Sequence, residues 1–317
     1  MTNRARPQAP SLSIAAVERE TGLPKDTLRV WERRYGFPQP DRDEAGDRLY
    51  PPGQVERLHA IRRLMDAGHR PGRIVSLELK ALQELAAVPA DGAKAGPAGA
   101  RDRFTGLDSY LELISRHDVQ RLRQELGQAA LRLGVDRFVT EVMAPLNTAV
   151  GEAWLKGRFQ VSQEHLYTEC VSGVLRSSIA AIPVARGAGA PRILLTTLPQ
   201  EPHGLGLLMA EALLALEGCA CLSLGPQTPA GDIVLAAQAH KADVVALSFT
   251  AVLAPKAVLA GLRQLREQLP EELAIWAGGE SPALYDQPIA GVVTVRSLAS
   301  LYGNVAEWRR ASATRRK

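Results

Sequence analysis

The fold is decided by the stretch Ile193-Leu-Leu-Thr-Thr-Leu198, which is followed by the loop Glu201-Pro-His-Gly-Leu-Gly206. The first segment has the leucine and threonine content of a buried strand, and the loop leads into a leucine- and alanine-rich segment, 207–216, typical of a helix. This order places His203 at the carboxyl end of a sheet strand, where open α/β folds bind their ligands. A single histidine in such a loop is more often structural, so further evidence is needed to choose between the two interpretations.

Strand and helix patterns keep alternating to the end of the chain. The pattern predicts strands at 193–198, 219–224, 243–248, 273–277 and 292–295, and helices at 206–217, 231–240, 255–268 and up to Trp308. Such alternation predicts a doubly wound, Rossmann-like parallel sheet over residues 190–310.

Two of these strands end in further polar or glycine motifs. Ser248-Phe-Thr250 follows one strand, and Gly278-Gly279 follows the next. Together with the loop that contains His203, they resemble the cobalamin-binding fingerprint of a D/E-x-H-x-x-G loop, an S-x-T or S-x-L segment and a glycine pair. The resemblance implies that His203 is the lower axial ligand of cobalt, with Glu201 as the partner of its second ring nitrogen. The motif glycines Gly204, Gly206, Gly278 and Gly279 would let the backbone approach the corrin and its nucleotide tail.

Composition excludes several classes of protein. The 317 residues are 46% hydrophobic and 23% charged, as expected of a soluble, multidomain globular protein. No apolar run has the length of a membrane span and the amino terminus lacks the apolar core of a signal peptide, so we expect a cytoplasmic protein with no membrane partner. Three cysteines do not make a disulfide framework.

The amino-terminal segment carries the positive charge of the chain. Residues 1–80 hold 15 Lys and Arg against 11 Asp and Glu, and the net charge of the whole chain is +4. Ser13 is a predicted cap for a short helix, and a second helix is predicted from Asp26 to Tyr35, ending at Gly36. Two short helices joined by a turn at Gly22 predict a helix-turn-helix. A small helical module with a solvated basic face is the alternative.

The continuation of this segment favours DNA binding. The runs Thr27-Leu-Arg-Val-Trp-Glu-Arg-Arg-Tyr-Gly36 and Asp47-Arg-Leu-Tyr50 resemble the MerR family of winged helix-turn-helix regulators, and the resemblance covers residues 11–85. It implies that double-stranded operator DNA is bound by Lys25, Thr27, Arg29, Arg33, Arg34 and Tyr35 around the recognition helix and by Arg42 and Arg48 in the wing. Trp31 and Tyr35 could equally be packing residues. Because each neutralised phosphate steepens the salt dependence, we expect binding to weaken sharply at high salt.

A linker and a helical domain lie between these two regions. Residues 86–102 are rich in Ala, Gly and Pro and predict a flexible tether, and apolar residues at helical spacing predict a four-helix bundle over 103–186. Pro145 is expected to interrupt or kink one of these helices. Within the bundle, Trp154 is followed after nine residues by Glu164-His165. In isolation these residues would be a core tryptophan and a solvated helix start.

Next to a cobalamin domain, the same residues resemble the cap of light-sensing, adenosylcobalamin-dependent MerR regulators of the CarH and LitR type. The resemblance implies that Trp154 packs over the upper face of the corrin, that Glu164 hydrogen-bonds the ribose of the adenosyl group, and that His165 replaces this group on cobalt after light breaks the cobalt–carbon bond. It further implies a repressor without enzymatic activity, which binds its operator as a homotetramer in the dark. A corrinoid carrier for methyl transfer, and a MerR regulator that senses cobalamin or a protein partner without light, are the alternatives.

Overall fold

The computed structural model describes residues 11–43, 46–66, 69–87, 106–183, 190–251 and 253–315. These residues form two compact units, of which the first holds the amino-terminal segment together with Glu152–Phe159. The second unit holds the other helices of the central segment and the carboxyl-terminal sheet. The predicted linker at 86–102 lies outside the described residues except for the last two residues of a helix, and the predicted domain boundaries stay predictions.

The first unit begins with the predicted helix-turn-helix. Helix α1 (Ile14–Thr21) is capped by the Ser13 side chain, which accepts a hydrogen bond from the Ala16 N–H at 3.3 Å, and Gly22 ends the helix at φ 69°. Helix α2 (Lys25–Tyr35) ends as expected at Gly36, also at positive φ. Its start differs from the prediction, because Pro24 takes the cap position and Asp26 lies inside the first turn.

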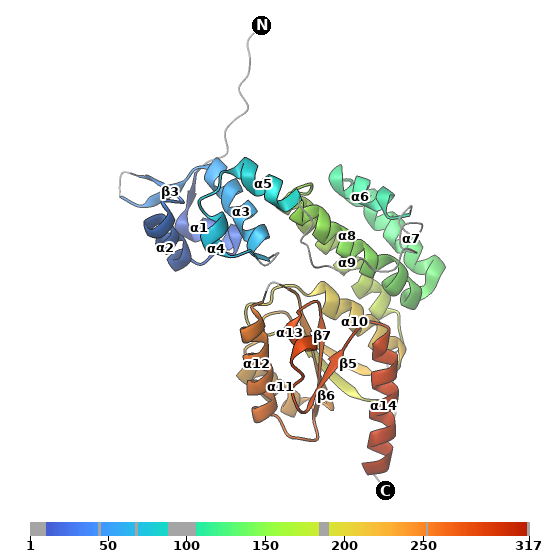
Figure 1. Ribbon diagram of the computed structural model, residues 1–317. Coiled ribbons are helices and arrows are strands. Elements are labelled where there is room, and N and C mark those ends of the chain that lie inside the picture. Colours follow the sequence, from blue (N-terminus) through green and yellow to red (C-terminus); the bar gives the residue numbers. More distant parts are fainter. Residues whose placement is uncertain are drawn as a thin grey trace. The chain divides into compact units, whose positions relative to one another are not determined.

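Three short strands and three helices complete this unit (Figure 1). The strands are β1 (Leu12–Ser13), β2 (Asp41–Arg42) and β3 (Arg48–Tyr50), and they form an antiparallel sheet in the order β1-β3-β2. The helices are α3 (Pro52–Asp66), α4 (Pro71–Ile74) and α5 (Leu79–Ala87). Leu28 and Trp31 of α2, Tyr50 of β3 and Leu58 of α3 share one apolar core, so the wing and the recognition helix are held by the same packing.

The helical part of the second unit contains one irregular passage. Its elements are α6 (Asp108–Ser115), α7 (Val119–Arg137), the π-helix η2 (Phe138–Met143), α8 (Ala144–Leu155) and α9 (Val161–Ala180), with Asp118 capping α7. Gly134 leaves the helical conformation inside α7. The interruption predicted at Pro145 is the π-helix just before it. A π-helical turn is wider than an α-helical one and leaves room for the proline ring, which would otherwise clash with the preceding turn.

The sheet of the second unit is parallel throughout and has the strand order β5-β4-β6-β7-β8. Its strands are β4 (Arg192–Thr196), β5 (Ala220–Gly225), β6 (Val244–Phe249), β7 (Ala274–Gly279) and β8 (Val292–Val295). Helices α10 (Leu205–Leu216) and α14 (Ser300–Arg315) cover one face. Helices α11 (Ala230–Ala239), α12 (Pro255–Gln268) and α13 (Ala283–Asp286) lie on the other side of the sheet (Figure 1).

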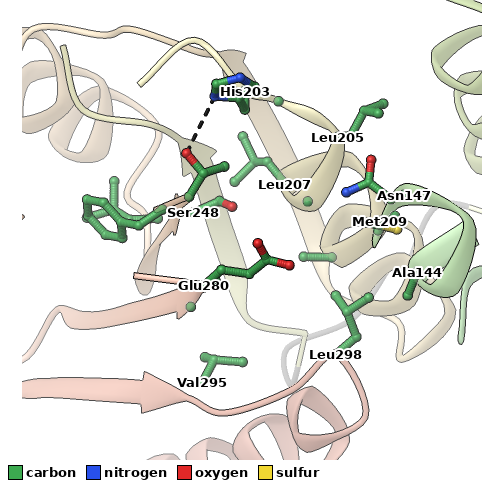
Figure 2. A pocket seen from close by; sticks show the side chains of 18 of the residues that line it. Ala144, Asn147, His203, Leu205, Leu207, Met209, Ser248, Glu280, Val295 and Leu298 are labelled. Carbon is green, nitrogen blue, oxygen red and sulfur yellow. Dashed lines mark hydrogen bonds between the residues drawn. The ribbon is translucent and has the colours of Figure 1, made fainter. Parts of the chain in front are cut away.

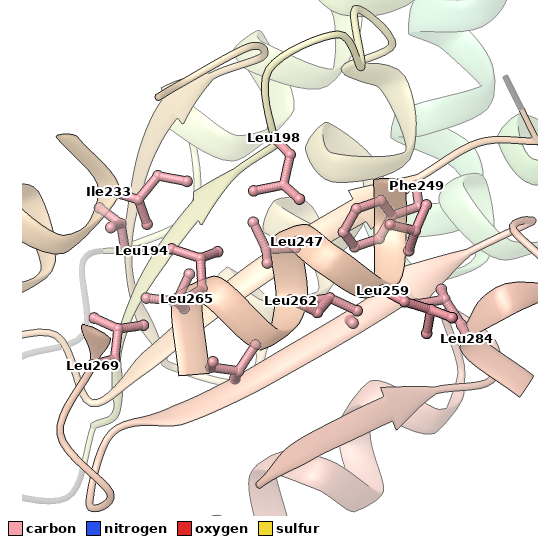
Figure 3. Close-up of a cluster of buried hydrophobic side chains, with 14 of the residues drawn as sticks. Leu194, Leu198, Ile233, Leu247, Phe249, Leu259, Leu262, Leu265, Leu269 and Leu284 are labelled. Carbon is pink, nitrogen blue, oxygen red and sulfur yellow. The ribbon is translucent and has the colours of Figure 1, made fainter. Parts of the chain in front are cut away.

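The core between the sheet and α12 is made of branched aliphatic side chains. Figure 3 shows Leu259, Leu262 and Leu265 of α12 facing Leu194 of β4 and Leu247 of β6. All five are buried, and each fully buried leucine stabilises the fold by roughly 1.5–3 kcal/mol. This packing fixes the strands whose carboxyl ends carry the predicted cofactor motifs. No helix of the described part of the chain is long and apolar enough to cross a membrane.

Gly279 at the end of β7 is required by the fold itself. Its φ is +123°, and a Cβ at this position would lie 2.0 Å from the carbonyl oxygen of Phe249 on the neighbouring strand. We therefore expect Gly279→Ala to lower the free energy of unfolding by about 3 kcal/mol, measured by denaturant unfolding of the full chain. The control is Gly231→Ala in α11, where a Cβ meets nothing within 4 Å and stability should be unchanged or slightly higher. Equal stability of the two variants would contradict this account of Gly279.

Candidate cofactor site and DNA-binding surface

The cofactor motifs meet where the strand order reverses. In the order β5-β4-β6-β7-β8, the chain moves outward from β4 to β5 and then returns to β6 on the other side of β4. The loops that follow β4 and β6 therefore diverge to opposite faces and leave a crevice at the carboxyl edge of the sheet. Glu201 and His203 follow β4, while Ser248 and Thr250 lie at the end of β6. Residues 47 positions apart are thus brought into contact.

Glu201 is a buried carboxylate that joins the two loops. Its side chain is fully inaccessible to solvent. One carboxylate oxygen, Oε1, lies 2.7 Å from His203 Nδ1 and accepts the His203 backbone N–H at 3.2 Å. The other, Oε2, accepts both the backbone N–H and the hydroxyl of Thr250, each at 2.8 Å. Burial alone would raise the pKa of Glu201, but the hydrogen bonds from His203 and Thr250 outweigh it and hold the pKa below its usual value.

The carboxylate sets the tautomer of His203. A carboxylate only accepts hydrogen bonds, so Nδ1 of His203 carries a proton and donates it to Glu201. A neutral ring then has its lone pair on Nε2, which is the atom able to coordinate a metal. About half of the His203 side chain is exposed, at 49%, although its partner is buried. Glu201 therefore orients the imidazole from its buried side, and the ring is exposed at the surface of the crevice.

A cavity of about 630 Å³ opens in front of His203. Figure 2 shows that strand ends contribute Ser248 and Val295, the helix after the first loop contributes Leu207 and Met209, and the bundle contributes Asn147 and Ala144. Nine of the eleven residues predicted to bind the cofactor line it. They are Glu164, His165, His203, Gly204, Gly206, Ser248, Thr250, Gly278 and Gly279.

The other two predicted residues lie elsewhere. Glu201 is beneath His203, as its predicted role requires. Trp154 does not line the cavity and belongs to the stretch that is grouped with the first unit, where the Arg63 guanidinium stands 5.8 Å from the centre of its ring. The predicted role of Trp154 above the corrin therefore stays a prediction.

The bundle contributes a polar wall to the cavity. Glu164 and His165 begin α9, and Glu164 Oε1 accepts a hydrogen bond from the Thr168 hydroxyl one turn later at 2.8 Å. The second oxygen of Glu164 lies 3.6 Å from His165 Nε2, and the His165 side chain is 71% exposed. Helix α8 adds Asn147 and Thr148, which sequence reasoning missed together with Glu280 and Arg296. These four residues stand outside any recognisable motif, and only the packing of α8 and the strand-end loops brings them to the site.

The motif glycines have structural causes besides ligand approach. A Cβ on Gly206 in the first turn of α10 would lie 3.0 Å from the Ser248 hydroxyl oxygen. A Cβ on Gly278 would lie 3.1 Å from the Val295 side chain. The spacing between the glycines and Ser248 therefore reflects close packing of α10 and the strand ends around the cavity floor.

The predicted DNA-binding residues differ in how far their charges are already paired. Arg33 and Arg34 are exposed, whereas Arg29 forms an exposed ion pair with Asp26 at 3.2 Å. Lys25 is 3.2 Å from Glu18 of α1. Such exposed pairs are worth about 0–1 kcal/mol and are readily exchanged for a phosphate. The α2 surface can therefore present cations to DNA at small cost.

The wing is connected to α2 by a stronger ion pair. Arg48 Nε donates to Glu32 Oε2 at 2.8 Å with both side chains about three-quarters buried, and this hydrogen bond raises the pKa of Arg48. Arg42 donates to the carbonyl oxygen of Gly46 within the wing at 2.8 Å. Of the two aromatic residues with alternative roles, Trp31 is buried in the core. Tyr35 is half-buried against the same core. Arg48 and Trp31 thus hold the DNA-binding elements in place.

Comparison with known proteins identifies the family of the chain. Residues 12–78 match the MerR HTH family regulatory protein family, and residues 107–177 match the B12 binding domain family. The chain is 31% identical over 293 residues to the HTH-type transcriptional repressor CarH of Myxococcus xanthus, covering 92% of this chain and 95% of the relative. It belongs to this family of MerR regulators with a B12-binding domain. The HTH-type transcriptional repressor CarA of the same organism is 30% identical over 78% of this chain and 79% of its own length.

The fold of the cobalamin-binding part has a solved counterpart. The monomethylamine corrinoid protein of Methanosarcina barkeri superposes with a TM-score of 0.51 at 17% identity, covering 65% of this chain and 98% of that protein. At this identity the likeness concerns the fold alone. The match to the B12 binding domain family falls on the helices at 107–177, and the cobalamin fingerprint on the sheet stays a prediction from the sequence.

The residues at the cavity fit a corrinoid. In the described ranges, no group of three or more His, Cys, Asp or Glu side chains is placed to hold a metal ion. His203 offers one oriented imidazole, which suits a metal whose equatorial ligands come from a macrocycle. The cavity in front of it is lined by small and apolar residues from the sheet side, including Gly204, Gly206 and Leu207, which leave room for a broad planar group.

The pKa of Glu201 predicts a pH dependence of stability. A folded-state pKa below the usual 4.5 means that ionised Glu201 stabilises the fold above pH 4.5, and this contribution is lost as the pH falls below 4.5 toward the folded-state pKa. We expect the difference in melting temperature between the wild type and Glu201→Gln to shrink between pH 5.5 and 3.5. Glu267→Gln, which removes an exposed carboxylate of α12, should follow the wild type at every pH. A constant gap for Glu201→Gln would contradict the role of the ionised carboxylate.

Proposed function

We propose that this MerR regulator is a transcriptional repressor that binds adenosylcobalamin and responds to light. The observation that carries the proposal is the cavity with His203 on its sheet side and Glu164 and His165 on its bundle side, in one chain with a helix-turn-helix. The name of its CarH relative supports the repressor function. The bound cofactor supplies a cobalt–carbon bond that light breaks. A soluble, cytoplasmic protein and a homotetrameric dark state are parts of the same proposal.

The residues of the chain couple the cofactor to assembly. His203, held by Glu201 and Thr250, would anchor the corrin from the sheet side, and Glu164, positioned by Thr168, would hold the upper group from the bundle side. Because His203 and Glu164 lie on opposite sides of the cavity, a cofactor held by both residues would favour one arrangement of bundle and sheet. If Glu164 lost its contact with the upper group, the equilibrium would shift by the difference in contact free energy between the two arrangements.

Assembly matters because one helix-turn-helix binds weakly. Several heads on one oligomer engage neighbouring operator sites at a high effective concentration, and dissociation of the oligomer removes this gain. The alternative of a corrinoid carrier accounts for His203 and the sheet, but it gives no role to the helix-turn-helix of residues 12–78. A regulator that senses cobalamin without light remains the second candidate, and the experiment below separates the two.

The direct test is a gel shift with promoter DNA at moderate salt. The purified full chain is loaded with adenosylcobalamin and compared in the dark and after green light, with absorption spectra of the same samples. We expect cooperative binding in the dark and its loss as the spectrum changes. Binding that ignores light while the spectrum changes would assign the protein to cobalamin sensing, and failure to bind the cofactor would overturn the proposal.

His203→Ala tests the lower ligand. Removal of a coordinating imidazole should weaken cobalamin binding by more than about a hundredfold. Mutations of residues that only hydrogen-bond to a metal ligand already lower metal affinity 10–100-fold. Equilibrium dialysis with adenosylcobalamin in the dark measures the loss. The control is His240→Ala at the exposed end of α11, which should bind normally. Normal binding by His203→Ala would exclude it as the ligand.

His165→Ala tests the proposed fate of the upper position. The variant should bind adenosylcobalamin and lose the adenosyl group in light, yet fail to give the stable spectrum of cobalt held by two imidazoles. His117→Ala at the end of α6 leaves both cavity histidines in place and serves as the control. If His165→Ala gives the wild-type spectrum after illumination, another group takes the upper position.

A further inference from the structure

The bundle wall of the cavity is more polar than the sheet wall. Apart from Ala144, every bundle residue that lines the cavity has a hydrogen-bonding side chain. These residues are Asn147 and Thr148 of α8 and Glu164, His165 and Thr168 of α9. A wall of this kind can form hydrogen bonds with a ligand that has several donors and acceptors, whereas a methyl group cannot take part in such hydrogen bonds.

Most of these side chains already have partners within the bundle. The Thr148 hydroxyl donates to the carbonyl oxygen of Ala144 at 3.2 Å. Thr168 donates to Glu164, whose second oxygen lies beside His165. Asn147 differs, because none of the residues placed by the structure hydrogen-bonds to its amide. Its side chain is half-buried and extends from the bundle helix into the cavity (Figure 2).

The amide of asparagine recognises one kind of group particularly well. It presents a donor and an acceptor side by side in one plane, and it pairs in two places with a base edge that offers the complementary pair, as adenine does through its exocyclic amine and N7. We propose that Asn147 binds the adenine of the group above the corrin and sets the preference for an adenosyl over a methyl upper ligand. This inference rests on the proposed cobalamin site.

The neighbouring turns of α8 leave space for such a base. Asn147 and Gly151 lie at i and i+4 and therefore share one face of the helix. Gly151 has no unusual φ, and a Cβ there would meet nothing within 4 Å. A glycine inside a helix costs about 1 kcal/mol relative to alanine. Neither backbone conformation nor packing against the described residues requires this glycine, and its missing side chain leaves open space one turn from Asn147, where a flat ring fits.

The experiment compares two cobalamins on the full chain in the dark. Asn147→Leu keeps the size of the side chain and removes its hydrogen bonds. We expect the dissociation constant for adenosylcobalamin to rise about tenfold, as for the loss of one or two hydrogen bonds, while that for methylcobalamin stays unchanged. Asn304→Leu on α14 replaces a half-buried asparagine that does not line the cavity, and it should bind both cofactors normally.

The outcomes separate this inference from the proposed function. Equal weakening for both cofactors, or no change for adenosylcobalamin, would overturn the role of Asn147 while the cobalamin site itself stands. A wild-type protein that binds neither cofactor would overturn both. Because methylcobalamin binding requires a folded cavity, its retention by Asn147→Leu also shows that the variant is folded. A Gly151→Leu variant should reproduce the selective loss by filling the space next to the amide, and Gly173→Leu, at an equally open glycine of α9, should not.

Discussion

The cofactor site depends on the burial of one carboxylate. Glu201 is inaccessible to solvent, and both of its oxygens are occupied by donors from loops that follow different strands. An ionised group in such a place is stable only while those hydrogen bonds persist, because desolvation without them costs several kcal/mol. The crevice at the strand reversal is therefore held in one shape, and the ring of His203 is fixed before any ligand arrives.

Helix α10 carries the effect of this site toward the bundle. It begins two residues after His203 and packs against α7 and α9 as well as against the sheet. The first turn of α10, next to His203, and the helix that carries Glu164 and His165 therefore belong to one packed group of helices. The glutamate at position 201 has one more methylene than the aspartate in the alternative form of the fingerprint, and this length suits a carboxylate that must reach both an imidazole and the Thr250 backbone. Helix α10 thus packs against both sides of the site, the sheet and the bundle.

Sequence predicted the parts of the site that follow from local order along the chain. His203 lies in the loop after one strand, and Ser248 and Gly278 lie in the last two residues of two others. The carboxyl ends of parallel strands lie at one edge, so their convergence could be predicted from periodicity. Asn147 could not be found in this way, because its place depends on how α8 packs and no motif marks it. Helix starts were predicted less well: Asp26 is a good cap by type, yet Pro24 fixes the backbone two positions earlier and takes its place. The positive charge of Arg48 suggested a DNA contact. Its ion pair with Glu32 could not be predicted, because only the fold brings the two residues together.

The glycine motif illustrates why a fingerprint alone does not prove ligand binding. A Cβ on Gly206 would crowd the Ser248 hydroxyl at 3.0 Å, and Gly279 must lack a side chain because a Cβ would lie 2.0 Å from the Phe249 carbonyl oxygen. Both steric constraints would apply equally if the domain bound no ligand. His203 is different, since a half-exposed imidazole held by a buried carboxylate contributes little to packing. Glu201 also joins the loops after β4 and β6 through Thr250, so its burial has a structural role of its own. The 49% exposure of the His203 ring is the part of the arrangement that this role does not explain.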